Sequence, residues 1–131
     1  MVFNLLIVSS SETDQSLACA LLQRRLNQDE NGRFKVTLLV GLERAVCSVD
    51  GQIDGQKYDC VIVDGFYSER HGYGAGSLAA PLIDELVNQG IPFGRFIGRS
   101  IPIPAPYGGL FVLSKPLQAN FRELILSAMA N

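Results

Sequence analysis

The stretch YDCVIVDG, residues 58–65, carries an apolar run that ends in a carboxylate at Asp64. The run lacks the alternation of a half-exposed strand, which predicts a strand of a parallel sheet that is covered on both faces. Ligands of open α/β sheets bind outside the carboxyl ends of such strands. Asp64 is therefore the first candidate for a functional residue.

Similar patterns lie on both sides of this strand. Further strands are predicted at residues 3–8, 34–40, 91–98 and 110–114. Helix patterns are predicted at residues 14–26, 42–49, 77–89 and 117–130, with Thr13 or Ser11 as the first N-cap and Gly90 after the third helix. Strands that alternate with helices predict a doubly wound α/β fold with a five-stranded parallel sheet.

One inter-strand segment does not fit a helix. Residues 99–109 contain Pro102, Pro104 and Pro106 at alternate positions. Each proline removes a backbone donor and pushes the residue before it toward extended geometry. We therefore expect no helix longer than one turn there, so that the helix between the fourth and fifth strands is short or missing.

Size and composition narrow the class of protein. The chain has 131 residues, a net charge of −2 and 47% hydrophobic residues, which predicts one domain over residues 1–131 and no nucleic-acid partner. No apolar run approaches the length of a membrane span, and no signal peptide or polybasic stretch is found, so we expect a cytoplasmic protein without a membrane partner. The three cysteines, Cys19, Cys47 and Cys60, lie in apolar surroundings and are interpreted as structural.

The ends of the predicted strands resemble a known family. YDCVIVDG, GIPFGRFIG and FVLSKPL, in this order and spacing, resemble the receiver domain of response regulators over nearly the whole chain. The resemblance implies the strand order 2-1-3-4-5, Asp64 as the phosphoacceptor and Lys115 as the ammonium that bridges to it. It also implies a peptide bond before Pro116 that is typically cis. We expect Lys115 and Asp64 to lie within about 4 Å of each other.

The chain departs from the family pattern at three places. Ser9 and Ser10 stand where the family has the acidic pair that holds Mg²⁺, and hydroxyls are poor substitutes for carboxylates. Ile97 and Val112 stand at the two switch positions, which in the family carry a hydroxyl and an aromatic side chain. No cofactor is predicted, Mg²⁺ binding should be weak or absent, and Asp64 alone is a weak metal ligand.

Two interpretations of the serines remain open at this point. They are relics of a lost metal site and act as polar loop residues that cap the first helix, or they contact a phosphate without a metal ion. The glycine-rich residues 65–76 are interpreted as a linker, because no lysine or further motif accompanies them as in a phosphate-binding loop.

The resemblance implies a stand-alone receiver-like protein of two-component or phosphorelay signalling, in which phosphorylation of Asp64 is impaired or lost. It would be no enzyme and would act by binding a histidine kinase, a phosphotransfer protein or a regulator. The alternative is a flavodoxin-like protein that binds flavin mononucleotide (FMN) through the SSSETDQS stretch at residues 9–16.

Overall fold

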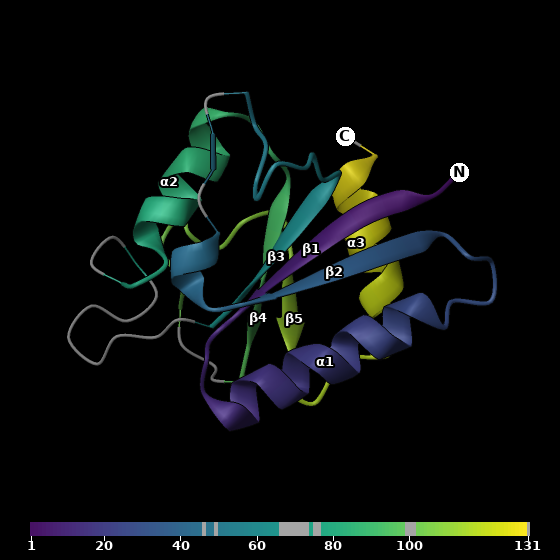
Figure 1. Ribbon diagram of the computed structural model, residues 1–131. Helices are drawn as coiled ribbons and strands as arrows, with labels where there is room; N and C mark the ends of the chain where they lie inside the picture. The colour runs from purple at the N-terminus through teal and green to yellow at the C-terminus, as the bar shows by residue number, and fades with distance from the viewer. Residues whose placement is uncertain (46, 49, 66–73, 75–76, 99–101, 131) are drawn as a thin grey trace.

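The fold is a five-stranded parallel sheet with helices on both faces (Figure 1). The computed structural model describes residues 1–45, 47–48, 50–65, 74, 77–98 and 102–130. Along the chain the elements are β1 (Phe3–Ser9), α1 (Thr13–Asn27), β2 (Phe34–Val40), η1 (Leu42–Arg44), β3 (Cys60–Asp64), α2 (Ala80–Asn88), β4 (Phe93–Ile97), β5 (Val112–Ser114) and α3 (Phe121–Met129). The strand order is β2-β1-β3-β4-β5, which confirms the predicted doubly wound fold and its order 2-1-3-4-5.

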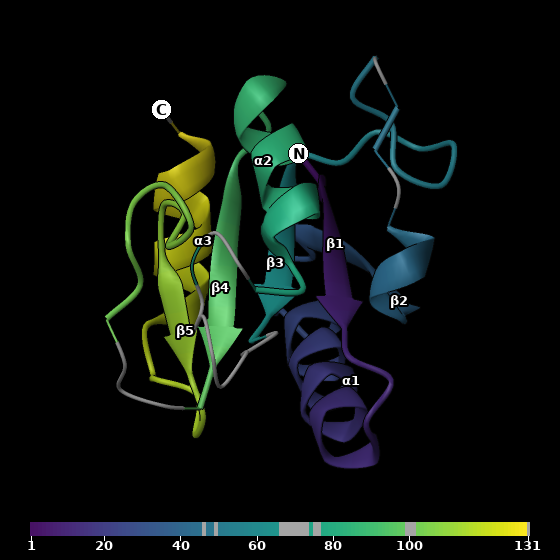
Figure 2. The ribbon, with the colours of Figure 1, turned by 90° about the vertical axis from the view of Figure 1, so that its left-hand side faces the viewer.

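The central strands are apolar because both of their faces are covered. All five residues of β3 are buried, and they alternate between two cores: Cys60 and Ile62 face one core, and Val61 and Val63 face the other. The first core lies under α1 and α3 and the second under α2 (Figures 1 and 2). The same parity directs Asp64 toward the α1 face of the sheet.

The helix predicted over residues 42–49 does not form as such. Among the residues of this stretch that the structure describes (42–45 and 47–48), Leu42–Arg44 alone are helical, as one 3₁₀ turn. The chain then forms bridges between Cys47 and Ile53 and between Ile53 and Gln56, and Ile53 is 1% exposed in the α2-side core. Burial of Ile53 requires a folded-back loop at this place, and this tertiary packing overrides the local helix pattern.

The proline segment behaves as predicted where the structure describes it. Residues 102–109 form extended chain and turns without a helix; residues 99–101 lie outside the described part. The segment is bonded to Arg95 of β4. The Arg95 side chain is fully buried, and its Nη1 donates to the Tyr107 carbonyl at 2.9 Å. Tyr107 in turn donates through its hydroxyl to Asp84 of α2 at 3.2 Å.

Two helix starts differ from the sequence prediction. Glu12, not Thr13 or Ser11, is the N-cap of α1, and its side chain makes no capping bond. The last helix begins at Phe121 instead of residue 117, because the side chain of Gln118 is bonded to β5. Its side-chain amide donates to the Val112 carbonyl at 2.8 Å and accepts from the Ser114 N–H at 2.8 Å, along the outer edge of β5. The end of α2 is as predicted, with Gly90 at φ +67° just beyond it.

Candidate functional site

Asp64 and Lys115 meet at the carboxyl edge of the sheet. Asp64 ends β3, and Lys115 follows β5 directly. The Lys115 Nζ lies 2.6 Å from the Asp64 Oδ1, which confirms the predicted pairing. The Asp64 side chain is fully buried and that of Lys115 is 24% exposed, so the lysine covers the carboxylate and reaches solvent itself.

The Lys115 ammonium is held by more than the carboxylate. It lies 4.6 Å from the centroid of the Phe96 ring, within the range of a cation–π interaction. Phe96 is the β4 residue paired with Asp64 in the sheet, so one strand pair supplies both contacts. The Lys115–Pro116 peptide bond is cis, as the resemblance implied.

The two oxygens of Asp64 differ in their surroundings. Oδ1 accepts from Lys115 and also from the backbone N–H of Gly65 at 2.9 Å. Oδ2 is buried and accepts no hydrogen bond from any residue that the structure describes. The carboxylate is thus neutralised on one oxygen only.

The floor of the site is formed by Cys19 of α1 and Ser9 of β1. Both are fully buried, and both lie on the α1 face to which Asp64 points. Burial, and after it the negative charge of Asp64, raises the pKa of the Cys19 thiol to about 12. The thiol is therefore neutral at physiological pH and adds no charge beside the carboxylate.

The serine hydroxyls are bonded within their own loop. Ser9 Oγ donates to the Ser10 carbonyl at 2.9 Å, and Ser10 Oγ accepts from the Glu12 N–H at 3.1 Å. Ser9 thus ends β1 and Ser10 lies in the connection to α1, and neither of them is the N-cap of the helix. The predicted capping role of the serines is therefore wrong, since the N-cap is Glu12, and a phosphate contact of these serines stays a prediction.

These donors do not fit a magnesium ion. Mg²⁺ requires near-octahedral oxygen ligands, usually carboxylates and waters. Here an ammonium occupies Oδ1 of Asp64, and the hydroxyls of Ser9 and Ser10 are used within the loop. In the described part of the chain, no three His, Cys, Asp or Glu side chains gather where they could hold a metal ion.

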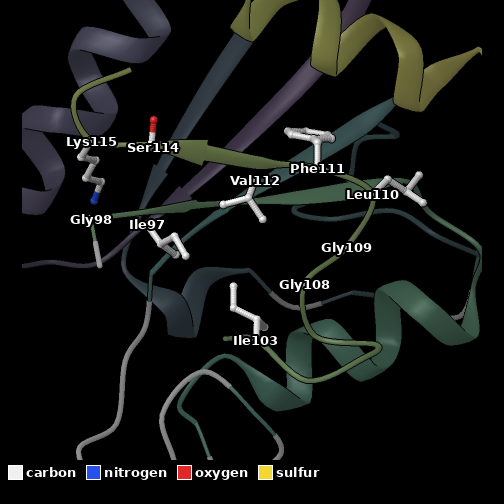
Figure 3. Close-up of a pocket in the computed structure, with 10 residues that line it drawn as sticks. All are labelled: Ile97, Gly98, Ile103, Gly108, Gly109, Leu110, Phe111, Val112, Ser114 and Lys115. Atoms are coloured by element: carbon white, nitrogen blue, oxygen red, sulfur yellow. The ribbon is translucent and has the colours of Figure 1, made fainter. Parts of the chain in front are cut away.

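The two switch positions lie on the other face of β4 and β5. Ile97 ends β4 and is 7% exposed, whereas Val112 of β5 is 40% exposed. Both line a hollow of about 570 Å³ together with Ile103 of the proline segment and Ser114 and Lys115 (Figure 3). No helix in the described part of the chain contributes a residue to the lining of this hollow.

Comparison with known proteins supports the architecture. No family model matches the sequence, and a search of the curated proteins finds no match. A solved structure described as the response regulator StyR, at low resolution, superposes with a TM-score of 0.53 and 13% sequence identity. The match covers 98% of this chain and 58% of that one, so this chain spans little more than half the length of its structural neighbour.

The fold is receiver-like. At 13% identity the likeness to StyR extends to the fold alone. Within this fold, none of the described helices is long and apolar enough to cross a membrane.

Sequence reasoning missed two residues of the site. Phe96 lies in a predicted strand without a role assigned to it, and Cys19 lies in a predicted helix and is interpreted as structural. The spacing of Phe96 one residue before Ile97 could have placed it beside Asp64, given the parallel register. Nothing in the local sequence distinguishes Cys19 from other core residues. The glycine-rich loop interpreted as a linker falls almost entirely outside the described residues.

The burial of the thiols predicts a pattern of cysteine reactivity. Cys19 and Cys60 are buried with pKa values of about 12, whereas Cys47 is half-buried and its pKa is raised less. At pH 8 the thiolate fraction of the two buried residues is on the order of one in ten thousand. We expect iodoacetamide to modify Cys47 alone in the folded protein, read by intact mass and peptide mapping. A Cys47→Ser variant should then take up no label until it is unfolded; fast labelling of Cys19 would contradict the packing described here.

Proposed function

We propose that this chain is a response-regulator receiver-like protein of two-component or phosphorelay signalling that acts by protein–protein interaction. Metal-dependent phosphorylation of Asp64 is impaired or lost. The observation that carries this proposal is that Asp64 is inaccessible to solvent. Its side chain is fully buried and paired with Lys115 at 2.6 Å.

The chemistry of phosphoryl transfer supports this proposal. A carboxylate that accepts a phosphoryl group needs a free oxygen in line with the leaving group, and cations that neutralise the transferring oxygens. In this site Oδ1 is engaged by Lys115 and Gly65, and Oδ2 is buried. A donor therefore meets neither an open carboxylate oxygen nor a set of metal ligands.

A signalling role without phosphorylation leaves docking as the mode of action. The partner classes are a histidine kinase, a phosphotransfer protein or a regulator. The receiver-like fold supports the choice of these classes, and the absence of a helix over residues 102–109 gives this chain a β4–β5 face of its own. Partner affinity should accordingly be the same before and after treatment with a phosphodonor.

The test is incubation with acetyl phosphate with and without Mg²⁺, read by intact mass. We expect no gain of one phosphoryl group over hours. The missing charge explains this result, since each charge about 4 Å from the ion contributes roughly 1–4 kcal/mol in a partly hydrated pocket. The loss of two carboxylates therefore weakens metal binding at least about thirtyfold.

Two variants sharpen this experiment. The double variant Ser9→Asp/Ser10→Asp should gain Mg²⁺ binding, measured by calorimetry, because it supplies the carboxylates that the site lacks. Asp64→Asn serves as the matched blank for any labelling. Rapid, Mg²⁺-dependent phosphorylation of the natural chain that disappears in Asp64→Asn would overturn the proposal.

A further inference from the structure

The outer side of α1 carries four exposed residues in one row. They are Asp14, Leu17, Leu21 and Arg24, with spacings of three, four and three residues. At 3.6 residues per turn they fall within about 80° of the helix circumference. The buried residues of the helix, Cys19, Leu22 and Leu26, point the other way into the core.

This row, the α1 stripe, exposes apolar surface at its centre. Leu17 is 58% and Leu21 is 59% exposed, and they lie one turn apart. The charged residues at its ends are not used internally, since neither Asp14 nor Arg24 forms an ion pair with any residue that the structure describes. Two adjacent exposed leucines flanked by unpaired opposite charges are a pattern typical of a contact surface.

Two copies of the α1 stripe that run in opposite directions are complementary to each other in charge and in apolar surface. The pair Asp14 and Arg24 and the pair Leu17 and Leu21 share one midpoint along the helix, at position 19. If a second α1 packs antiparallel across a two-fold axis at that point, Asp14 faces Arg24 of the second copy and Leu17 faces Leu21 of the second copy. A two-fold contact repeats each pair twice, as self-complementary interfaces require.

We propose that α1 is the contact surface of a homodimer, in which two copies of this chain pack their α1 stripes antiparallel. The proposal does not depend on the signalling role proposed above. The partner is a second copy of this chain because, in the antiparallel arrangement, each acid meets an arginine and each leucine meets a leucine.

A hollow beside the stripe supplies the complementary shape. It has a volume of about 260 Å³, and its lining includes Leu21, Arg25, Phe96, Pro116 and Leu117. Leu21 belongs both to the stripe and to the rim of the hollow, so Leu17 of the second copy reaches this place in the antiparallel arrangement. Lys115 also lines the hollow, so the proposed contact lies beside the Asp64–Lys115 site.

The dimer should be weak and sensitive to salt. One helix face is smaller than the surface of about 800 Å² per partner that stable complexes bury. Its flanking ion pairs are exposed and are screened at high ionic strength. We expect a reversible monomer–dimer equilibrium in sedimentation velocity at protein concentrations up to about 1 mM, shifted toward monomer by added salt.

Charge exchange gives the decisive experiment. Arg24→Glu places two acids opposite each other, and Asp14→Arg places two arginines opposite each other, so each variant alone should dimerise at least about tenfold more weakly. An equimolar mixture of the two variants restores both opposite-charge pairs and should form a heterodimer. Arg44→Glu makes the same change of charge on an exposed residue outside α1 and should leave the equilibrium unchanged.

The apolar centre is tested separately. Leu17→Gln and Leu21→Gln should each weaken the dimer, whereas Leu78→Gln, at a leucine that is 68% exposed and outside α1, should not. Circular dichroism and the thermal midpoint verify that every variant is folded. A natural chain that stays monomeric to about 1 mM, or a mixture of charge variants that stays monomeric, overturns the proposal.

Discussion

Lys115→Met is expected to lower the free energy of unfolding by about 3 kcal/mol, because it leaves the buried Asp64 carboxylate without its cation. Methionine keeps the length of the side chain and its contacts with the apolar surroundings, so the loss reports the charge. Urea unfolding followed by circular dichroism measures the change.

Two further variants identify the cause of this loss. In Asp64→Leu/Lys115→Met the buried charge is removed together with its partner, and this double variant should be more stable than Lys115→Met alone. Lys57→Met, at an exposed lysine without an ion pair in the described part of the chain, should change stability by less than about 0.5 kcal/mol. A Lys115→Met variant as stable as the natural chain would show that Asp64 needs no cation.

Gly94→Ala should lower the stability by about 3 kcal/mol. Gly94 is the second residue of β4, and a Cβ atom there would overlap the ring of Phe111, which is 6% exposed in the core under α1 and α3. The ring must then leave its place, which disturbs the segment that leads into β5. Thermal and urea unfolding both measure the effect.

The matched control for this substitution is Gly98→Ala, just beyond the same strand. A Cβ atom at Gly98 lies 3.6 Å from the Lys115 side chain, an ordinary contact, so this change should be neutral or slightly stabilising. Phe111→Leu in the Gly94→Ala background should cost less than Phe111→Leu alone, because it removes the overlap. Equal stability of Gly94→Ala and the natural chain would contradict the described packing of Phe111.

The sheet could be predicted from the sequence because a buried strand shows as a local run of apolar residues. β1 and β3 are covered on both faces, and residues 5–8 and 60–63 form continuous apolar runs. The pairing of Asp64 and Lys115 was implied by the resemblance to receiver domains, and the topology agrees with it, since parallel strands bring their carboxyl ends to one edge. The proline segment was predictable for a similar reason, because proline restricts the backbone whatever surrounds it.

What could not be predicted depends on contacts between distant residues. The pattern over residues 42–49 resembles a helix, but the burial of Ile53 in the core decides the conformation of that segment. The start of α3 was placed four residues too early because Gln118 bonds to β5, a contact invisible in the helix pattern. The contacts of Cys19 and Phe96 with the site likewise need the assembled sheet.

The bonds of Gln118 also determine where the sheet stops. Its amide nitrogen and oxygen take the carbonyl of Val112 and the N–H of Ser114, which are the groups that an incoming strand would need. The Gln118 side chain thus forms two hydrogen bonds that a sixth strand would otherwise form with β5. Strands from other molecules must first displace it, so the β5 border resists the edge-to-edge growth by which open sheets polymerise into fibres.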